Sequence, residues 1–198
     1  MMYHLLSFFL KLLSYIPFGV LYVLSDCLFY PLYYIVRYRR KVVRRNLTES
    51  FPEKSEQEIK RIEKGFYRFF TDQVPESCKM MTISPEEITR RMKFANVEAA
   101  NAVFRKGKSI ALYMGHYGNW EWVPSIPLCL EKNAMAVQIY HKLSNENMDR
   151  LMLNNRERLG AISVEMRKTA RFITDMVQNG KVGIVGFIAD HSPRKKDA

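Results

Sequence analysis

The sequence has little cysteine. Its 198 residues contain three cysteines, Cys27, Cys78 and Cys129, which are widely spaced and include no Cys-x-x-Cys pair. An odd number of dispersed cysteines argues against a disulfide framework and against a zinc site built on cysteine pairs. The simple interpretation is three reduced thiols in a protein that faces the cytosol.

The sequence also lacks the usual nucleic-acid-binding motifs. Its 31 Lys and Arg outnumber 20 Asp and Glu, and the net charge of +11 favours an anionic partner. There is no recognisable zinc finger, RNP-type aromatic motif or basic-zipper heptad, so nucleic acid is disfavoured. Acidic lipid headgroups and an acidic carrier protein are the remaining partners that the charge predicts.

Charge is scarce at the N-terminus. The first 36 residues carry only Lys11 and Asp26. Residues 19–36 approach the roughly 20 apolar residues that a bilayer crossing needs. Asp26 would cost about 2.5–3.5 kcal/mol near the bilayer centre, and Pro31 would loosen the helix. These features favour a segment that is half-inserted or packed on the domain, with residues 3–16 as a second, interfacial stretch.

A basic run follows the apolar segment directly: Arg37, Arg39, Arg40, Lys41, Arg44 and Arg45. Such a run would meet anionic lipid at a membrane surface and, if the segment spans, would place the rest of the chain in the cytoplasm. A signal peptide is disfavoured because no basic region precedes the apolar run and no small-residue cleavage site follows it. A membrane anchor is therefore predicted, and a buried helix of a soluble protein is the alternative.

Residues 38–108 are predicted to be helical. The sequence 55–58 forms a capping box, followed by apolar residues at helical spacing: Ile59, Ile62, Phe66, Phe69 and Phe70. Ser84 and Pro85 mark another helix start, and Gly107 closes a short helix at about 96–105.

The pattern then changes to short apolar runs that alternate with helical stretches. The runs are 109–114, 134–140, 161–166 and 182–189, and the helices lie near 120–131, 146–159 and 168–179. This alternation predicts an α/β fold with a mainly parallel sheet flanked by helices. The predicted organisation is an anchor at 1–36, a basic helical segment at 37–108 and an α/β catalytic core at 109–198.

The candidate chemistry lies at the end of the first predicted strand. The sequence 115–122 reads Gly-His-Tyr-Gly-Asn-Trp-Glu-Trp, so His116 stands at the strand's carboxyl end, where active sites of parallel sheets lie. The glycines loosen the turn, and Glu121 in the next helical turn can reach one imidazole nitrogen. The other nitrogen can then act as a general base on an acceptor hydroxyl.

A metal site is disfavoured at this position. The spacing is not His-Glu-x-x-His, and His116 with Glu121 supplies too few ligands for a catalytic zinc. No metal and no cofactor are predicted. His141 is interpreted as an ordinary hydrogen-bonded histidine.

These residues resemble a known family. The His-x4-Glu motif in 115–122 is similar to the signature of bacterial lipid A biosynthesis acyltransferases, which add lauroyl or myristoyl chains within the lysophospholipid acyltransferase superfamily. Further similar segments follow in the family's order, so the resemblance covers nearly the whole chain; they are 44–47, 50–53, 140–145, 148–151, 156–160 and 183–193.

The resemblance implies a glycerolipid-acyltransferase-like fold and a reaction. His116, paired with Glu121, would be the general base that activates a hydroxyl of a lipid A precursor or related glycolipid. The acyl donor would be the thioester of acyl carrier protein, and the protein would act at the cytoplasmic face of the inner membrane. The positive charge suits both an acidic carrier and a phosphorylated glycolipid.

The resemblance also implies a substrate-binding set of Arg150, Arg156, Arg158, Asn119 and Asp190. Arg156 or Arg158 would stabilise the oxyanion or hold a substrate phosphate. A solvated helix face is the alternative for the three arginines, and Asp190 could be structural at the edge of the site. His191 stands where the family usually has glutamine, and the family's chains continue with further strands, so this chain is expected to be C-terminally truncated.

Two other functions remain open. A non-catalytic membrane-binding remnant would use the basic surface to hold anionic lipid without acyl transfer. A phospholipid or other glycolipid acyltransferase of the same superfamily would share the His116 chemistry.

Overall fold

The computed structural model describes residues 2–190, and the side chains of residues 7–190. The chain divides into two compact units. The helical unit is Phe8–Lys79, and the α/β unit begins at Met80 and also includes the first residues as far as Ser7. Helix α1 (Met2–Tyr15) contributes to both units.

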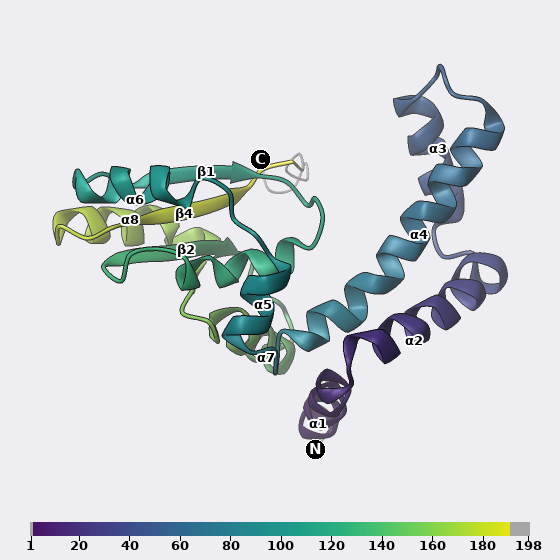
Figure 1. Ribbon diagram of the computed structural model, residues 1–198, viewed down its shortest axis with the longest axis horizontal. Helices are drawn as coiled ribbons and strands as arrows, with labels where there is room; N and C mark the ends of the chain where they lie inside the picture. The colour runs from purple at the N-terminus through teal and green to yellow at the C-terminus, as the bar shows by residue number, and fades with distance from the viewer. Residues whose placement is uncertain (1, 191–198) are drawn as a thin grey trace. The chain divides into compact units, whose positions relative to one another are not determined.

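The helical unit is organised around two helices that pack against each other, α2 and α4 (Figure 1). The capping box predicted at Ser55 is confirmed, because the Glu58 N–H donates to Ser55 Oγ and the Glu58 carboxylate accepts from the Ser55 N–H at 3.0 Å. The segments of this unit after α1 are α2 (Phe18–Tyr30), the π-helical η1 (Pro31–Val36), α3 (Arg40–Ser50) and α4 (Glu56–Lys79).

A buried carboxylate lies at the centre of the helical unit. The Glu63 side chain is fully buried, and its Oε1 accepts hydrogen bonds from the Tyr33 hydroxyl at 2.7 Å and from Arg40 Nε at 2.8 Å. Arg44 donates to Oε2. Burial alone would raise the pKa of Glu63, but these donors lower it below its ordinary value. Hydrogen bonds to the Glu63 carboxylate of α4 thus link η1 and α3 to α4.

The outer surface of the helical unit is unusually apolar. The apolar face predicted for α4 is divided: Ile59 is buried, whereas Phe66, Phe69 and Phe70 are exposed. The continuous helix Phe18–Val36 is long and apolar enough to cross a membrane by length and composition. Its exposed large apolar side chains are Val20, Val23, Leu24, Leu28, Tyr30, Tyr34, Ile35 and Val36.

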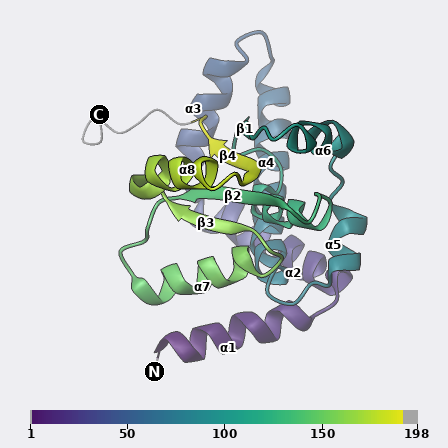
Figure 2. The same cartoon turned by 90° about the vertical axis from the view of Figure 1, so that its left-hand side faces the viewer.

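The α/β unit contains a four-stranded sheet in which every pairing is parallel. The strand order is β1-β4-β2-β3, as Figure 2 shows. The predicted α/β class, the parallel sheet and all four predicted strand positions are confirmed. The strands are β1 (Ile110–Met114), β2 (Ala134–Tyr140), β3 (Ile162–Glu165) and β4 (Val182–Ile188).

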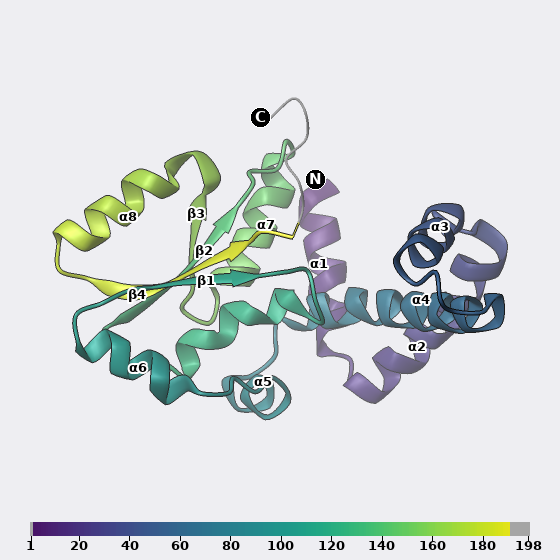
Figure 3. The same cartoon turned by 90° about the horizontal axis from the view of Figure 1, so that it is seen from above.

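Helices cover both faces of the sheet, as Figure 3 shows for α6 and α8. Alternate residues of β4 point to the two faces. Ile184 packs with Phe104 of α6 (Val97–Arg105) on one face. Val185 packs with Met176 of α8 (Thr169–Gln178) on the other. The sheet is therefore buried on both sides, which is typical of parallel sheets.

One glycine permits the close packing of the central strands. A Cβ on Gly183 would lie 2.3 Å from the Met135 carbonyl oxygen, a distance that real Cβ atoms essentially never show. Glycine at this position of β4 is required by the approach of β2.

Most of the remaining elements of the α/β unit lie at the predicted positions, and the short 3-10 helix Met166–Lys168 was not predicted. The cap predicted at Ser84 is confirmed, because the Glu87 N–H donates to Ser84 Oγ at 3.2 Å. The stretch predicted as a helix near 120–131 is a 3-10 helix, and Pro124 and Pro127 inside it explain why a regular α-helix does not form. These elements are α5 (Pro85–Arg91), η2 (Trp120–Leu128), α7 (Glu146–Glu157) and η3 (Met166–Lys168).

Candidate active site

The candidate site begins where β1 and β4 end side by side. The two strands are in register from Ile110 with Ile184 to Met114 with Ile188. The pairing continues one residue further, since the Ala189 N–H donates to the Met114 carbonyl oxygen at 3.0 Å. The residues that follow each strand are thereby held next to each other at the carboxyl edge of the sheet, where ligand sites of such folds lie.

His116 and Asp190 meet at this edge through two hydrogen bonds. Asp190 Oδ1 lies 2.8 Å from His116 Nδ1, and Asp190 Oδ2 accepts from the His116 backbone N–H at 2.8 Å. The backbone N–H and then the ring lower the pKa of the Asp190 carboxyl below its ordinary value. Both side chains are partly exposed, at 37% for His116 and 40% for Asp190, so the ring remains accessible.

The turn after β1 is tight. The Tyr117 N–H donates to the Gly115 carbonyl oxygen at 2.8 Å, and Gly118 has a φ of +60°, which glycine adopts without strain. The His116 ring packs edge-to-face against Trp120, with centroids 5.1 Å apart and an interplanar angle of 78°. The turn and the indole together fix the position of the imidazole.

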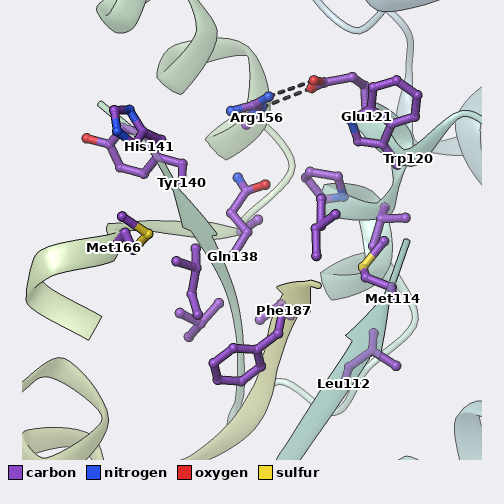
Figure 4. A pocket seen from close by; sticks show the side chains of 18 of the residues that line it. Leu112, Met114, Trp120, Glu121, Gln138, Tyr140, His141, Arg156, Met166 and Phe187 are labelled. Carbon is purple, nitrogen blue, oxygen red and sulfur yellow. Dashed lines mark hydrogen bonds and ion pairs between the residues drawn. The ribbon is translucent and has the colours of Figure 1, made fainter. Parts of the chain in front are cut away.

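Glu121 lies in the first turn of η2 and forms a bidentate ion pair with Arg156 of α7. Arg156 Nε donates to Oε2 at 2.9 Å, and Nη2 donates to Oε1 at 2.6 Å. The side chains are only 13% and 23% exposed. Hydrogen bonding to Glu121 raises the pKa of Arg156 above its ordinary value. Figure 4 shows the pair spanning the gap between its two helices.

A cavity of about 690 Å³ opens beside these groups. His116, Glu121 and Arg156 are among its lining residues, and most of the other lining side chains are apolar. In Figure 4 the Glu121–Arg156 pair lies at one side, with Leu112, Met114 and Phe187 further from it. The apolar lining also includes Val123, Ile126, Val137, Ile139, Leu153 and Ile184. A mainly apolar cavity with a few polar groups suits an apolar chain with a reactive polar end.

The structure brings together some of the predicted site residues and places others elsewhere. Asn119 precedes η2, and Arg150 is exposed on α7. Arg158 donates to the carbonyl oxygens of Met80, at 2.7 Å, and Ile83. These bonds brace the segment before α5, and burial lowers the pKa of Arg158. The substrate-binding roles of Asn119, Arg150 and Arg158 remain predictions, as does the pairing of His116 with Glu121.

Sequence reasoning missed the contact between His116 and Asp190. The two residues are 74 positions apart, and only the adjacency of β1 and β4 brings them together. The signal available was that each follows a predicted strand. His141, expected to be an ordinary histidine, lines the cavity and has Nδ1 at 3.0 Å from the Lys142 carbonyl oxygen. His191, Ser192 and Pro193 lie outside the described residues.

The described residues contain no group of three or more His, Cys, Asp or Glu side chains that could hold a metal ion. The polar groups that line the cavity include the imidazole of His116, the carboxylate of Glu121 and the guanidinium of Arg156, and Asp190 contacts the His116 ring. These groups can move a proton and stabilise a developing negative charge.

The fold and the site define an α/β protein with a mainly apolar cavity and with groups suited to acid–base chemistry beside it. The particular family follows from comparison with known proteins: residues 1–198 match the family described as Bacterial lipid A biosynthesis acyltransferase. The chain belongs to this family and is an acyltransferase, with an acyl donor and a lipid acceptor as its substrates. Comparison with curated proteins gave no significant match.

Proposed function

We propose that this protein transfers a fatty acyl group from the thioester of acyl carrier protein to a hydroxyl of a lipid A precursor or related glycolipid, with His116 as general base. The observation that carries the proposal is the apolar cavity of about 690 Å³ that has His116 and the Glu121–Arg156 pair among its lining residues. A fatty chain fits the apolar lining, and its carbonyl would then lie near the polar groups.

The proposed reaction needs one base and no cofactor. A ring nitrogen of His116 takes the proton of the acceptor hydroxyl as its oxygen attacks the thioester carbonyl carbon. The tetrahedral intermediate then collapses, the carbon–sulfur bond breaks, and the imidazolium returns the proton to the leaving thiolate. The products are an ester and a free thiol, so protons and electrons balance without an external reactant.

Arg156 supplies the positive charge that this reaction requires. The bidentate contact with Glu121 fixes the guanidinium at the cavity. A fixed cation in a partly buried site can stabilise the oxyanion of the tetrahedral intermediate or hold a substrate phosphate. We therefore propose Glu121 as an active-site residue because it holds Arg156. Its pairing with His116 stays a prediction of the sequence motif.

The membrane attachment is proposed to come from the helical unit. The exposed apolar side chains of Phe18–Val36 would enter the bilayer, and the basic run that follows would contact anionic headgroups. Membrane association is a property of the family. The inner membrane and its cytoplasmic face are the proposed location, where the acyl carrier protein would be the soluble donor.

The test is a donor-by-acceptor transfer assay on the full chain in anionic vesicles. Radiolabelled acyl carrier thioester and a lipid A precursor are expected to give labelled glycolipid. Replacing the donor by acyl coenzyme A tests the donor class, and replacing the acceptor by lysophosphatidate tests the phospholipid alternative. If no donor–acceptor pair gives product while the chain still binds vesicles, the proposal fails in favour of a membrane-binding remnant.

A further inference from the structure

We propose that Asp190 is the positioning residue for the His116 imidazole, a role that the spacing of the sequence motif suggests for Glu121. This inference rests on the proposed function of His116 as general base. It assigns to Asp190 the task of fixing the ring's orientation and its tautomer for proton transfer.

The contact uses both oxygens of one carboxylate. Oδ1 lies 2.8 Å from Nδ1 of His116, and Oδ2 accepts from the backbone N–H of the same residue at 2.8 Å. One bond orients the ring and the other fixes the backbone that carries it. A carboxylate bound to a residue at both points restricts the imidazole more strongly than a bond to the ring alone.

This geometry selects the tautomer that a base needs. A carboxylate can only accept hydrogen bonds, so the proton of the neutral ring is placed on Nδ1. The lone pair is then on Nε2, and that nitrogen is the one that takes the hydroxyl proton. The negative charge of Asp190 also stabilises the imidazolium that forms during transfer.

The pairing of β4 with β1 places Asp190 next to His116. The Ala189 N–H bond to the Met114 carbonyl oxygen continues the strand pairing to the residue before Asp190. The carboxylate also lies close against Gly115, where an added Cβ would be 3.2 Å from Oδ2. A side chain at position 115 would therefore press on the carboxylate, and glycine leaves the room that the contact requires.

The contacts of Glu121 are consistent with this assignment. Its Oε1 and Oε2 accept from the two arms of the Arg156 guanidinium at 2.6 and 2.9 Å. We therefore assign Glu121 to holding Arg156, and Asp190 to holding the imidazole. The two carboxylates at the site would then act through different partners.

The experiment compares Asp190→Asn with Asp175→Asn in the full chain in vesicles. Asp175 is exposed on α8, away from the cavity lining, and its substitution makes the same change in charge. Asp190→Asn is expected to lower kcat about 10²- to 10⁴-fold with little change in KM, since the amide nitrogen would favour the wrong tautomer. The ascending limb of its pH–rate profile is expected to move to lower pH. Asp175→Asn should behave as the unmodified protein.

A spectroscopic readout tests the same point without turnover. The ¹⁵N chemical shifts of labelled histidine are expected to report a proton on Nδ1 of His116 in the unmodified protein and a different tautomer in Asp190→Asn. Asp190→Glu is expected to recover part of the loss. The inference is overturned if Asp190→Asn keeps its kcat and tautomer while Glu121→Gln changes the tautomer. If His116→Ala itself keeps full activity, the proposed function fails instead.

Discussion

The helical unit and the α/β unit each place a carboxylate against arginine side chains, but they do so in different surroundings. In the helical unit the Glu63 side chain is completely buried and accepts hydrogen bonds from Tyr33, Arg40 and Arg44, whose donors hold the carboxylate inside the fold. In the α/β unit Glu121 holds a single arginine, Arg156, and that pair lines a cavity. The same kind of ion pair lies inside the packed helices in one unit and at the cavity in the other, where the proposed function gives it a role with the substrate.

The two units also differ in where their apolar side chains lie. The α/β unit buries them against both faces of its sheet and around the cavity. The helical unit leaves Phe66, Phe69 and Phe70 of α4 exposed, and it also leaves many large apolar residues of Phe18–Val36 exposed. A large exposed apolar area marks an interaction surface. Under the proposed function, lipid would therefore contact the protein in two ways, as a single acyl chain in the cavity and as a bilayer at the helical unit.

The largest effect is expected from a substitution that should abolish catalysis and leave membrane binding intact. His116→Ala removes the proposed base and is expected to lower the rate of transfer by about 10²- to 10⁴-fold. Binding to vesicles should not change, because the helical unit is untouched. Tyr117→Phe is the matched control, since Tyr117 is the next residue and is 94% exposed. Near-normal transfer by His116→Ala would remove this residue from the mechanism.

A second substitution tests the buried charge of the helical unit. Glu63→Ala leaves Arg40 and Arg44 without their carboxylate and is expected to lower the free energy of unfolding by about 3 kcal/mol. Urea unfolding measures the change. Glu121→Ala should also lower stability, because it leaves the partly buried Arg156 without its carboxylate, but it should in addition reduce transfer, which Glu63→Ala should not. The contrast between the units would be wrong if both substitutions affected stability and transfer equally.

Low pH should lower the stability of the helical unit because Glu63 becomes protonated. The pKa of folded Glu63 lies below that of the unfolded chain, which is about 4.3. The unfolded chain therefore binds the proton more readily, and this contribution to stability is complete above the unfolded pKa and is lost as pH falls through the folded pKa. The difference in urea midpoint between the unmodified protein and Glu63→Gln is expected to shrink below about pH 4. A constant difference at all pH values would contradict this.

The smallest effect concerns the basic surface. Lys41→Gln removes one exposed charge of α3 and is expected to weaken binding to anionic vesicles by about 1 kcal/mol, or roughly fivefold, at low salt. The loss should disappear at high salt because screening removes the attraction. Lys181→Gln in the α/β unit, another exposed lysine, is the control. If Lys41→Gln and Lys181→Gln lost the same amount of vesicle affinity, binding would depend on net charge alone and not on the basic run of the helical unit.

Much of the fold could be predicted because local signals agree with it. The runs at 134–140 and 182–189 are mainly apolar segments bounded by polar residues, and they correspond to β2 and β4. The caps at Ser55 and Ser84 depend only on residues three positions away. The exposure of Phe66, Phe69 and Phe70 was not predictable, because helical periodicity identifies an apolar face but does not state what covers it.

The site was predictable in its residues more than in its pairings. His116 at the end of β1 followed from the strand and the glycine-bounded turn. The contact with Asp190 depends on β4 lying next to β1, an order that no local pattern contains. Arg156 was expected at the site from the resemblance, but its bond to Glu121 required η2 and α7 to face each other. Long-range pairing is the information that the sequence alone did not supply.

The most direct test of the central claim is to locate the acyl chain during turnover. An acyl carrier thioester with a photoreactive diazirine in its chain can be crosslinked to the vesicle-bound protein, and the labelled peptides identified by mass spectrometry. Labels are expected on cavity residues of β1 and β4, such as Leu112, Met114 and Phe187. Labels confined to α2 and α4 of the helical unit would show that the acyl chain does not enter the cavity.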